Sequence, residues 1–190
     1  VSDIAMASGN GTPTLATTGD VITLTFTSDE EIDTPTVIIA GKSAAVTSSD
    51  NLDWIATYTV ESGDDQGLAA FVISAIVDLS GNPAANVTAL KVGSAVTIDT
   101  AAPAVTTADV VTTIDEGLTA LGSVSADETV TWSITGAGVE ISTNGDVSLT
   151  AAAVFGTTYA FTVTATDAAS NPTTTSAFSV TVNGNPNFTL

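Results

Sequence analysis

One short pattern occurs twice in this chain, and its spacing constrains the fold more than any other feature. Residues 74–83 read SAIVDLSGNP and residues 163–172 read VTATDAASNP. In both, an alternating apolar run ends at an Asp, two small or apolar residues follow, and then come Gly or Ser and Asn-Pro. The two Asp residues, Asp78 and Asp167, are 89 residues apart. Because this interval matches one small β-domain, it predicts two units built on one plan.

The rest of the chain consists largely of short segments typical of β-strands. They are rich in β-branched residues, often alternate in polarity, and are separated by Gly, Asn, Asp, Ser or Pro. These segments are residues 21–28, 36–41, 54–60, 71–77, 130–135, 147–150, 159–166 and 178–182. No window shows a helical period with caps, and the many Thr residues disfavour helix. We therefore predict an all-β fold of two tandem β-sandwich domains arranged end to end.

The boundary between the two domains is predicted at residues 96–103, which read VTIDTAAP. A last strand there runs into a short link that ends in Pro and contains no Gly/Ser tract, so we expect limited freedom at the joint. The predicted division is a first sandwich over residues 1–102, a second over residues 103–184, and the start of a further linker over residues 185–190.

The charge balance excludes two classes of partner. The chain has 21 acidic residues against two basic ones, Lys42 and Lys91, and its net charge is -19. Neutralising phosphates requires Lys or Arg, so we expect no binding to nucleic acid or anionic lipid. No apolar run approaches the roughly 18 residues of a membrane helix, so we also expect no membrane insertion.

The missing residue types limit the chemistry further. The chain has no Cys, His or Arg. Disulfides, zinc–thiolate sites and the common pairs of nucleophile and base are therefore impossible. Paired carboxylates remain, as in glycosidases, but those act from a sugar-binding cleft, and acids in the end loops of small sandwiches offer none. We expect no enzymatic activity.

The acidic residues gather, by topology, at one joint. In a seven-stranded antiparallel sandwich, alternate loops fall at opposite ends. The bottom loops of the first unit and the top loops of the second would then meet where the units stack. Repulsion between these carboxylates favours a divalent cation, and calcium accepts 6 to 8 oxygen ligands in loose geometry. The predicted interdomain calcium ligands are Asp64, Asp65, Asp99, Asp127, Glu128 and Asp167.

Further candidate calcium ligands are Glu30, Asp78 and Glu116. Asp78 is also explained as a turn residue, since Asp and Asn side chains bond to local backbone groups. Glu30 belongs to an acidic run that reads equally well as a solvated loop. Trp54 and Trp132 lie within alternating strands, which favours core positions over sugar-binding platforms.

The motifs also resemble a known family. The first unit, with GDVITLTFTSDE, DLSGNP and VTIDTAAP, resembles the bacterial Ig-like repeats of very large surface adhesins. The second unit, with SADETVTWSI, NGDVSLT and FTVTATDAASN, resembles the cadherin-like repeats in the extender regions of RTX-type adhesins. This resemblance implies export, a spacer role and calcium bound between domains. Where cadherin-like repeats usually carry an acidic pair, residues 151–155 read AAAVF, and we expect fewer than three ions at the joint.

Two functions follow as expectations. The first is a structural extender segment of a bacterial cell-surface adhesin: extracellular, stiffened by calcium, and holding a binding tip away from the cell in adhesion or biofilm formation. Its partners would be adjacent repeats of the same polypeptide and calcium ions, and the fragment alone would be a monomer. The alternative is a module that binds glycan or protein, or an accessory module of a secreted multidomain enzyme. An aromatic content of only 5% favours the extender.

Overall fold

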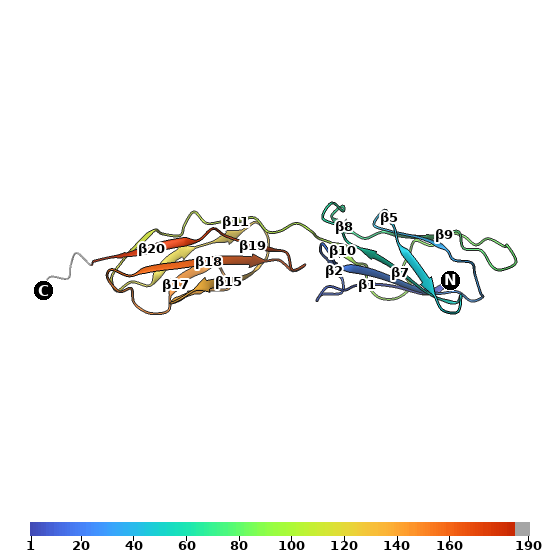
Figure 1. Cartoon of the computed structure of the whole chain (residues 1–190), viewed down its shortest axis with the longest axis horizontal. Coiled ribbons are helices and arrows are strands. Elements are labelled where there is room, and N and C mark those ends of the chain that lie inside the picture. Colours follow the sequence, from blue (N-terminus) through green and yellow to red (C-terminus); the bar gives the residue numbers. More distant parts are fainter. Residues whose placement is uncertain (185–190) are drawn as a thin grey trace. The chain divides into compact units, whose positions relative to one another are not determined.

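The computed structural model describes residues 1–184 of the chain (Figure 1). These residues contain twenty β-strands and no helix. The prediction of an all-β chain is confirmed. The chain divides into two units, the first spanning Val1–Thr100 and the second beginning at Ala101. The predicted linker at residues 185–190 lies outside the described residues. Among the residues described, none forms a helix long and apolar enough to cross a membrane.

A four-stranded antiparallel sheet forms one layer of the first unit. Its order is β1 (Ser2–Ser8), β3 (Val21–Thr27), β7 (Asp53–Thr59) and β6 (Ala45–Ser48). Alternate side chains of β3 are buried, as the sequence VITLTFT predicts. Phe26 pairs with Trp54 across the sheet, and their rings stack with centroids 6.3 Å apart.

Two three-stranded sheets complete the first unit. One has the order β5 (Lys42–Ser43), β4 (Thr36–Ile39) and β9 (Phe71–Ser74). The other has the order β2 (Leu15–Ala16), β10 (Thr97–Ile98) and β8 (Gly67–Leu68), with β10 parallel to β2. Inward side chains from these sheets and from the four-stranded sheet share one core, which includes Leu24, Phe26, Ile39 and Ile73. Each such side chain contributes about 1.5–3 kcal/mol when fully buried.

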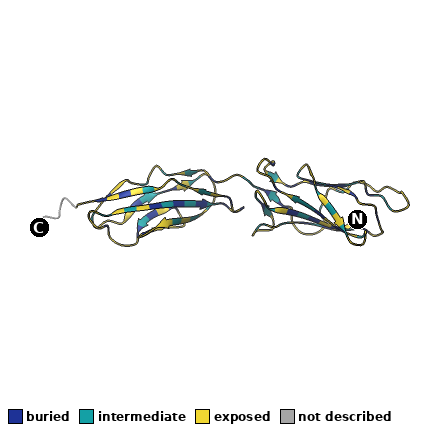
Figure 2. Cartoon of the chain, viewed as in Figure 1, coloured by how far each residue is buried: buried dark blue, intermediate teal, exposed yellow. Residues whose placement is uncertain are grey.

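The second unit repeats the two-layer plan with its own core. One layer contains β12 (Thr113–Asp115), β20 (Phe178–Asn183), β18 (Thr158–Thr166) and β15 (Thr131–Gly136), with β19 (Pro172–Thr174) paired to β18. The other contains β13 (Ala120–Ser123), β17 (Asp146–Leu149) and β16 (Val139–Ile141). A short pair, β11 (Val105–Thr106) with β14 (Ser125–Ala126), lies at the start of the unit. From Phe161 onward, buried residues alternate with half-buried ones along β18 (Figure 2).

Both Trp side chains pack against apolar cores. Trp54 is 2% exposed and belongs to the first core, while Trp132 is half-buried against the second. The interpretation of both as packing residues therefore agrees with the structure.

A bulge in β13 depends on a glycine, and this gives the first test of the fold. Gly122 has a φ of 112°, and a Cβ there would overlap the backbone carbonyl of Asp109. We expect Gly122→Ala to destabilise the second unit by about 3 kcal/mol, because left-handed strain adds to a backbone clash.

Gly156 provides the matched control for this change. Its φ is 77°, but nothing lies within 4 Å of a Cβ built there. We expect Gly156→Ala to cost only the conformational strain, about 1–2 kcal/mol. Urea denaturation of the two variants measures the difference, and equal losses would contradict the clash.

Candidate functional site

The recurring pattern forms the same turn in both units. In the first, Asp78 Oδ1 accepts hydrogen bonds from the backbone N–H of Ser80 at 2.9 Å and of Asn82 at 2.8 Å. Asp78 Oδ2 accepts from Asn82 Nδ2 at 2.7 Å. The Asp78 N–H in turn donates to the Asn82 carbonyl at 3.1 Å. The turn interpretation of Asp78 agrees with these bonds.

The copy in the second unit has matching bonds in a more buried place. Asp167 Oδ1 accepts from the Asn171 N–H at 2.8 Å, and Oδ2 accepts from Asn171 Nδ2 at 2.8 Å. The Asp167 N–H donates to the Asn171 carbonyl at 3.2 Å. Asp167 is 7% exposed and Asn171 8%. An Asp and an Asn four residues apart thus form one repeated hydrogen-bonded box, which we call the Asp–Asn box.

In the first box, hydrogen bonding favours the ionised form of the carboxylate. At Asp78 the side-chain bond from Asn82, followed by the Asn82 and Ser80 backbone N–H groups, holds the pKa of the carboxyl below its ordinary value. A carboxylate that accepts two or three hydrogen bonds can still bind a cation, because its two oxygens together offer about four lone-pair sites.

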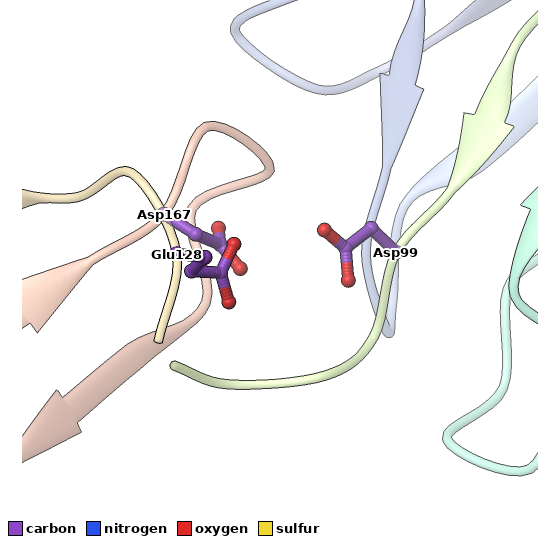
Figure 3. A group of neighbouring side chains, drawn as sticks. All are labelled: Asp99, Glu128 and Asp167. Carbon is purple, nitrogen blue, oxygen red and sulfur yellow. The ribbon is translucent and has the colours of Figure 1, made fainter. Parts of the chain in front are cut away.

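A second carboxylate lies beside Asp167 in the second unit. Glu128 follows β14, and its carboxylate oxygen lies within 4.8 Å of that of Asp167. Figure 3 shows these two side chains directed to one place from the loops after β14 and β18. Glu128 is exposed to solvent, whereas Asp167 is buried. The structure therefore brings together two of the six predicted ligands within the second unit.

Asp127, the neighbour of Glu128, contacts the start of its own unit. Its Oδ1 accepts from the Ala104 N–H at 2.8 Å, and its own N–H donates to the Ala104 carbonyl at 3.2 Å. This reciprocal pair continues the ladder of Val105 with Ala126. Asp127 thus binds Ala104, near the start of the second unit, to the loop that carries Glu128.

In the first unit, Asp99 lies where the last strand ends. Its N–H donates to the Ala16 carbonyl at 2.8 Å, one residue beyond β10. Figure 3 shows its side chain beside this strand. The next residue, Thr100, is bound by Gln66, whose loop also carries Asp64 and Asp65. Three predicted ligands of the first unit therefore belong to adjoining segments at one end of that unit.

Asp64 has a structural role within the first unit. Its Oδ2 accepts from Tyr58 Oη at 2.6 Å and from the Glu61 N–H at 2.9 Å, and its Oδ1 lies 3.8 Å from Lys42 Nζ. Burial acts to raise the pKa of Asp64, but the hydrogen bonds from Tyr58 and Glu61 and the Lys42 charge outweigh it and leave the pKa below its ordinary value. Burial, and then the bond to Asp64, raise the pKa of Tyr58 to about 12. Asp65, by contrast, is exposed.

The further candidates lie away from these residues. Glu30 and Asp78 both line a hollow of about 140 Å³ in the first unit, together with the buried Ser28. Glu116 lies beside the end of β20, where its N–H donates to the Asn183 carbonyl at 3.0 Å. All of these assignments remain predictions.

Sequence reasoning did not single out Tyr58, Lys42 or Gln66 as neighbours of the predicted ligands. Tyr58 lies six residues before Asp64, a local spacing that could have indicated the contact. Gln66 and Thr100 are 34 residues apart, and no sequence signal relates them.

Comparison with known proteins identifies the fold. No protein-family model matches the chain, and no curated protein matches it either. The I-band fragment I67–I69 of titin is similar with a TM-score of 0.50 and 10% identity, over 95% of this chain and 65% of the fragment. The chain folds as tandem Ig-like β-sandwiches. It spans just under two thirds of the titin fragment.

Two further solved structures are similar with lower scores. The fibronectin(III)-like modules of Clostridium thermocellum CbhA have 14% identity and a TM-score of 0.42, over 95% of each chain. Drosophila N-cadherin EC1-3 has 16% identity and a TM-score of 0.40, over 96% of this chain and 68% of that one.

We expect replacement of the Asn in the Asp–Asn box to destabilise the second unit more than the first. In the presence of a calcium chelator, Asn171→Ala should destabilise the second unit by about 1–3 kcal/mol. The substitution removes the side-chain amide that donates a hydrogen bond to the buried Asp167 Oδ2. Asn82→Ala should cost the first unit less, because water reaches Asp78. Chemical denaturation followed separately for each unit by NMR tests this, and a larger loss for Asn82→Ala would refute it.

Tyr58 gives a prediction that depends on pH. At neutral pH, Tyr58→Phe should destabilise the first unit by about 1.5–3 kcal/mol, because it removes a hydrogen bond to a buried charge. The pKa of Asp64 lies below 3.8 in the folded chain, so the stability it contributes is present above pH 3.8 and is lost as pH falls through the folded value. The loss caused by Tyr58→Phe should therefore shrink below pH 3.8.

Tyr159, which packs against the second core, serves as the control for this experiment. Tyr159→Phe should leave the unfolding free energy of both units nearly unchanged across the same pH range. Stability curves measured between neutral and acidic pH separate the two variants. A Tyr58→Phe loss that stays constant far below pH 3.8 would contradict the assigned role of Asp64.

Proposed function

We propose that this chain is a structural extender segment of a bacterial cell-surface adhesin, made rigid by calcium at the joint between its two units. In this role the tandem sandwiches hold a binding tip away from the cell, outside the membrane. The partners are adjacent repeats of the same polypeptide and calcium ions. The tandem Ig-like fold is consistent with a structural or binding module.

The observation that carries the calcium part is the Glu128–Asp167 pair. Two like charges about 4 Å apart repel by about 4 kcal/mol at an effective dielectric of about 20, and by less where water screens them. The Asp–Asn box fixes the position of the Asp167 carboxylate, so movement of that side chain does not relieve the repulsion. A divalent cation converts this repulsion into attraction.

The short linker between the units supports Asp99 as a further calcium ligand. Asp99 precedes Ala104 by only five residues, and Ala104 is hydrogen-bonded to the loop that carries Glu128. A chain of five residues spans at most about 18 Å when fully extended. The covalent connection therefore limits how far Asp99 can lie from the loop that carries Glu128, which makes Asp99 the candidate ligand from the first unit.

The donor set favours calcium over other metals. Carboxylate and backbone oxygens are hard ligands, and calcium accepts six to eight of them at flexible angles. Magnesium demands stricter octahedral geometry and keeps its waters, while zinc and copper sites usually use His or Cys. The chain has neither of these residues.

Calcium should stabilise the folded chain and lose this effect when the pair is broken. At a hundredfold excess over its dissociation constant, a ligand of the folded state adds about 2.7 kcal/mol, so the melting temperature should rise with calcium and rise less with magnesium. Glu128→Gln should weaken calcium binding at least tenfold in calorimetric titration, because it removes one charged ligand.

Glu140→Gln is the matched control, since Glu140 is exposed on β16 and is not among the predicted ligands. It should leave calcium affinity unchanged. Equal stabilisation by calcium and magnesium would indicate general charge screening, and equal losses of affinity in the two variants would place the ion elsewhere. Either result would remove the calcium part of the proposal.

A second candidate function is ligand binding, and one surface feature favours it. An apolar groove of about 300 Å³ in the first unit is lined by Met6, Leu68, Phe71 and Leu90 among others. The Leu68 side chain is 73% exposed, which is high for a large aliphatic residue. Under this alternative the chain would recognise glycan or protein, or serve a secreted multidomain enzyme as an accessory module.

A further inference from the structure

We propose that Gln66 is a positioning residue that fixes the end of the first unit at Thr100, so that bending between the units is confined to residues 101–103 even without a cation. This restraint does not depend on calcium binding. It rests on hydrogen bonds within each unit on either side of the linker, and on the two restricted residues that the linker contains.

The strand ladder of the first unit ends one residue before Thr100. In the parallel pair of β10 with β2, the Thr97 N–H donates to the Thr14 carbonyl and the Asp99 N–H to the Ala16 carbonyl, each at 2.8 Å. Strand pairing alone would therefore release the chain after Asp99. Thr100 itself is bound by a side chain, that of Gln66.

Gln66 binds Thr100 at two points. Its Oε1 accepts from the Thr100 N–H at 2.9 Å, and its Nε2 donates to Thr100 Oγ1 at 2.7 Å. The same Nε2 lies 3.3 Å from the Asp64 carbonyl, to which it also donates. Water competes for exposed hydrogen bonds, so each contributes little alone, but two bonds from one planar amide fix both the position and the direction of the chain.

The loop that carries Gln66 is itself held in place. Asp64, two residues earlier, is 6% exposed and accepts from the Tyr58 hydroxyl on β7. Its carboxylate also closes a turn by accepting from the Glu61 N–H, while its own N–H donates to the Glu61 carbonyl at 3.1 Å. Gln66 thus projects from a loop that is tied to the four-stranded sheet, and it transmits that rigidity to Thr100.

The second unit begins with a matching restraint. Ala104 exchanges two hydrogen bonds with Asp127, at 2.8 Å and 3.2 Å, directly before β11 pairs with β14. The chain is therefore fixed at Thr100 on one side and at Ala104 on the other. Only Ala101, Ala102 and Pro103 lie between the two restrained points.

These three residues have few soft dihedral angles. The ring of Pro103 fixes its φ near −65°. Ala102 precedes a proline, which excludes the helical region and leaves extended conformations. Ala101 is neither a proline nor followed by one, so proline chemistry does not restrict its dihedral angles. These restrictions on the linker backbone are present whether or not an ion is bound.

The test measures amide exchange and the heteronuclear NOE by NMR in variants of the full chain, with a chelator present to remove calcium. In Gln66→Ala, we expect the Thr100 amide to exchange with solvent about tenfold faster and the heteronuclear NOE of residues 100–102 to fall, while the melting temperature of the first unit stays within a few degrees. Thr100→Val, which keeps the shape but loses the hydroxyl, should show a smaller change of the same kind. Thr100→Ser keeps both bonds and should match the natural chain.

Ser62→Ala is the control within the same loop, because Ser62 is exposed. It should leave exchange at Thr100 unchanged. Faster exchange and a lower NOE in Gln66→Ala and Thr100→Val, with Thr100→Ser and Ser62→Ala unaffected, support the proposal. Unchanged values in Gln66→Ala overturn it, and if that variant does not fold, unchanged values in Thr100→Val overturn it equally.

Discussion

Carboxylates that accept hydrogen bonds from loop N–H groups hold the ends of both sandwiches in shape. Asp20 Oδ2 accepts from the Thr17 N–H and from Asn10 Nδ2, each at 2.8 Å. At Asp50, bonds from the backbone N–H groups of Asp53 and Leu52 hold the pKa of the carboxyl below its ordinary value. The side chains of Asp64, Asp78, Asp127 and Asp167 also accept hydrogen bonds from backbone N–H groups. With 21 acids and two bases, ion pairs cannot satisfy these side chains, and the backbone does so instead.

This use of acids has an electrostatic consequence for the whole chain. The excess of acidic residues gives the chain a formal net charge of -19 at pH 7. Such a charge keeps the chain soluble and opposes association between copies, but its self-repulsion also acts against the compact state. At physiological ionic strength, salt screens the repulsion between exposed charges that lie more than about 8–10 Å apart. A bound divalent cation instead relieves the repulsion at one point.

The sequence predicted the features of the fold that depend on local pattern. Alternation along VITLTFT and YAFTVTAT located β3 and β18 because side chains of a strand point to opposite faces. The repeated Asp and Asn, four residues apart, located both turns because the bonds that close them are local. Glu128 and Asp167 were grouped by topology alone, through the rule that alternate loops share an end.

What could not be predicted depends on contacts between distant segments. Nothing in the run Asp64-Asp65-Gln66 indicates that the first residue is buried, the second exposed and the third bonded to Thr100. Those differences arise from where Tyr58, Lys42 and the end of β10 lie once the sheets have packed. The same applies to Asp127, whose bond to Ala104 spans 23 residues and is indistinguishable in sequence from a solvent-exposed acid.

The parallel pairs of strands determine how each unit responds to a pulling force. In the first unit β2 runs parallel to β10, and in the second β12 runs parallel to β20. Tension applied through the two ends of a unit draws such partners past each other along their length, so their hydrogen bonds are loaded together in shear. Antiparallel partners pulled from the same end would instead separate bond by bond. In each sandwich, the few bonds of the parallel pair therefore have to break together before its strands can slide apart.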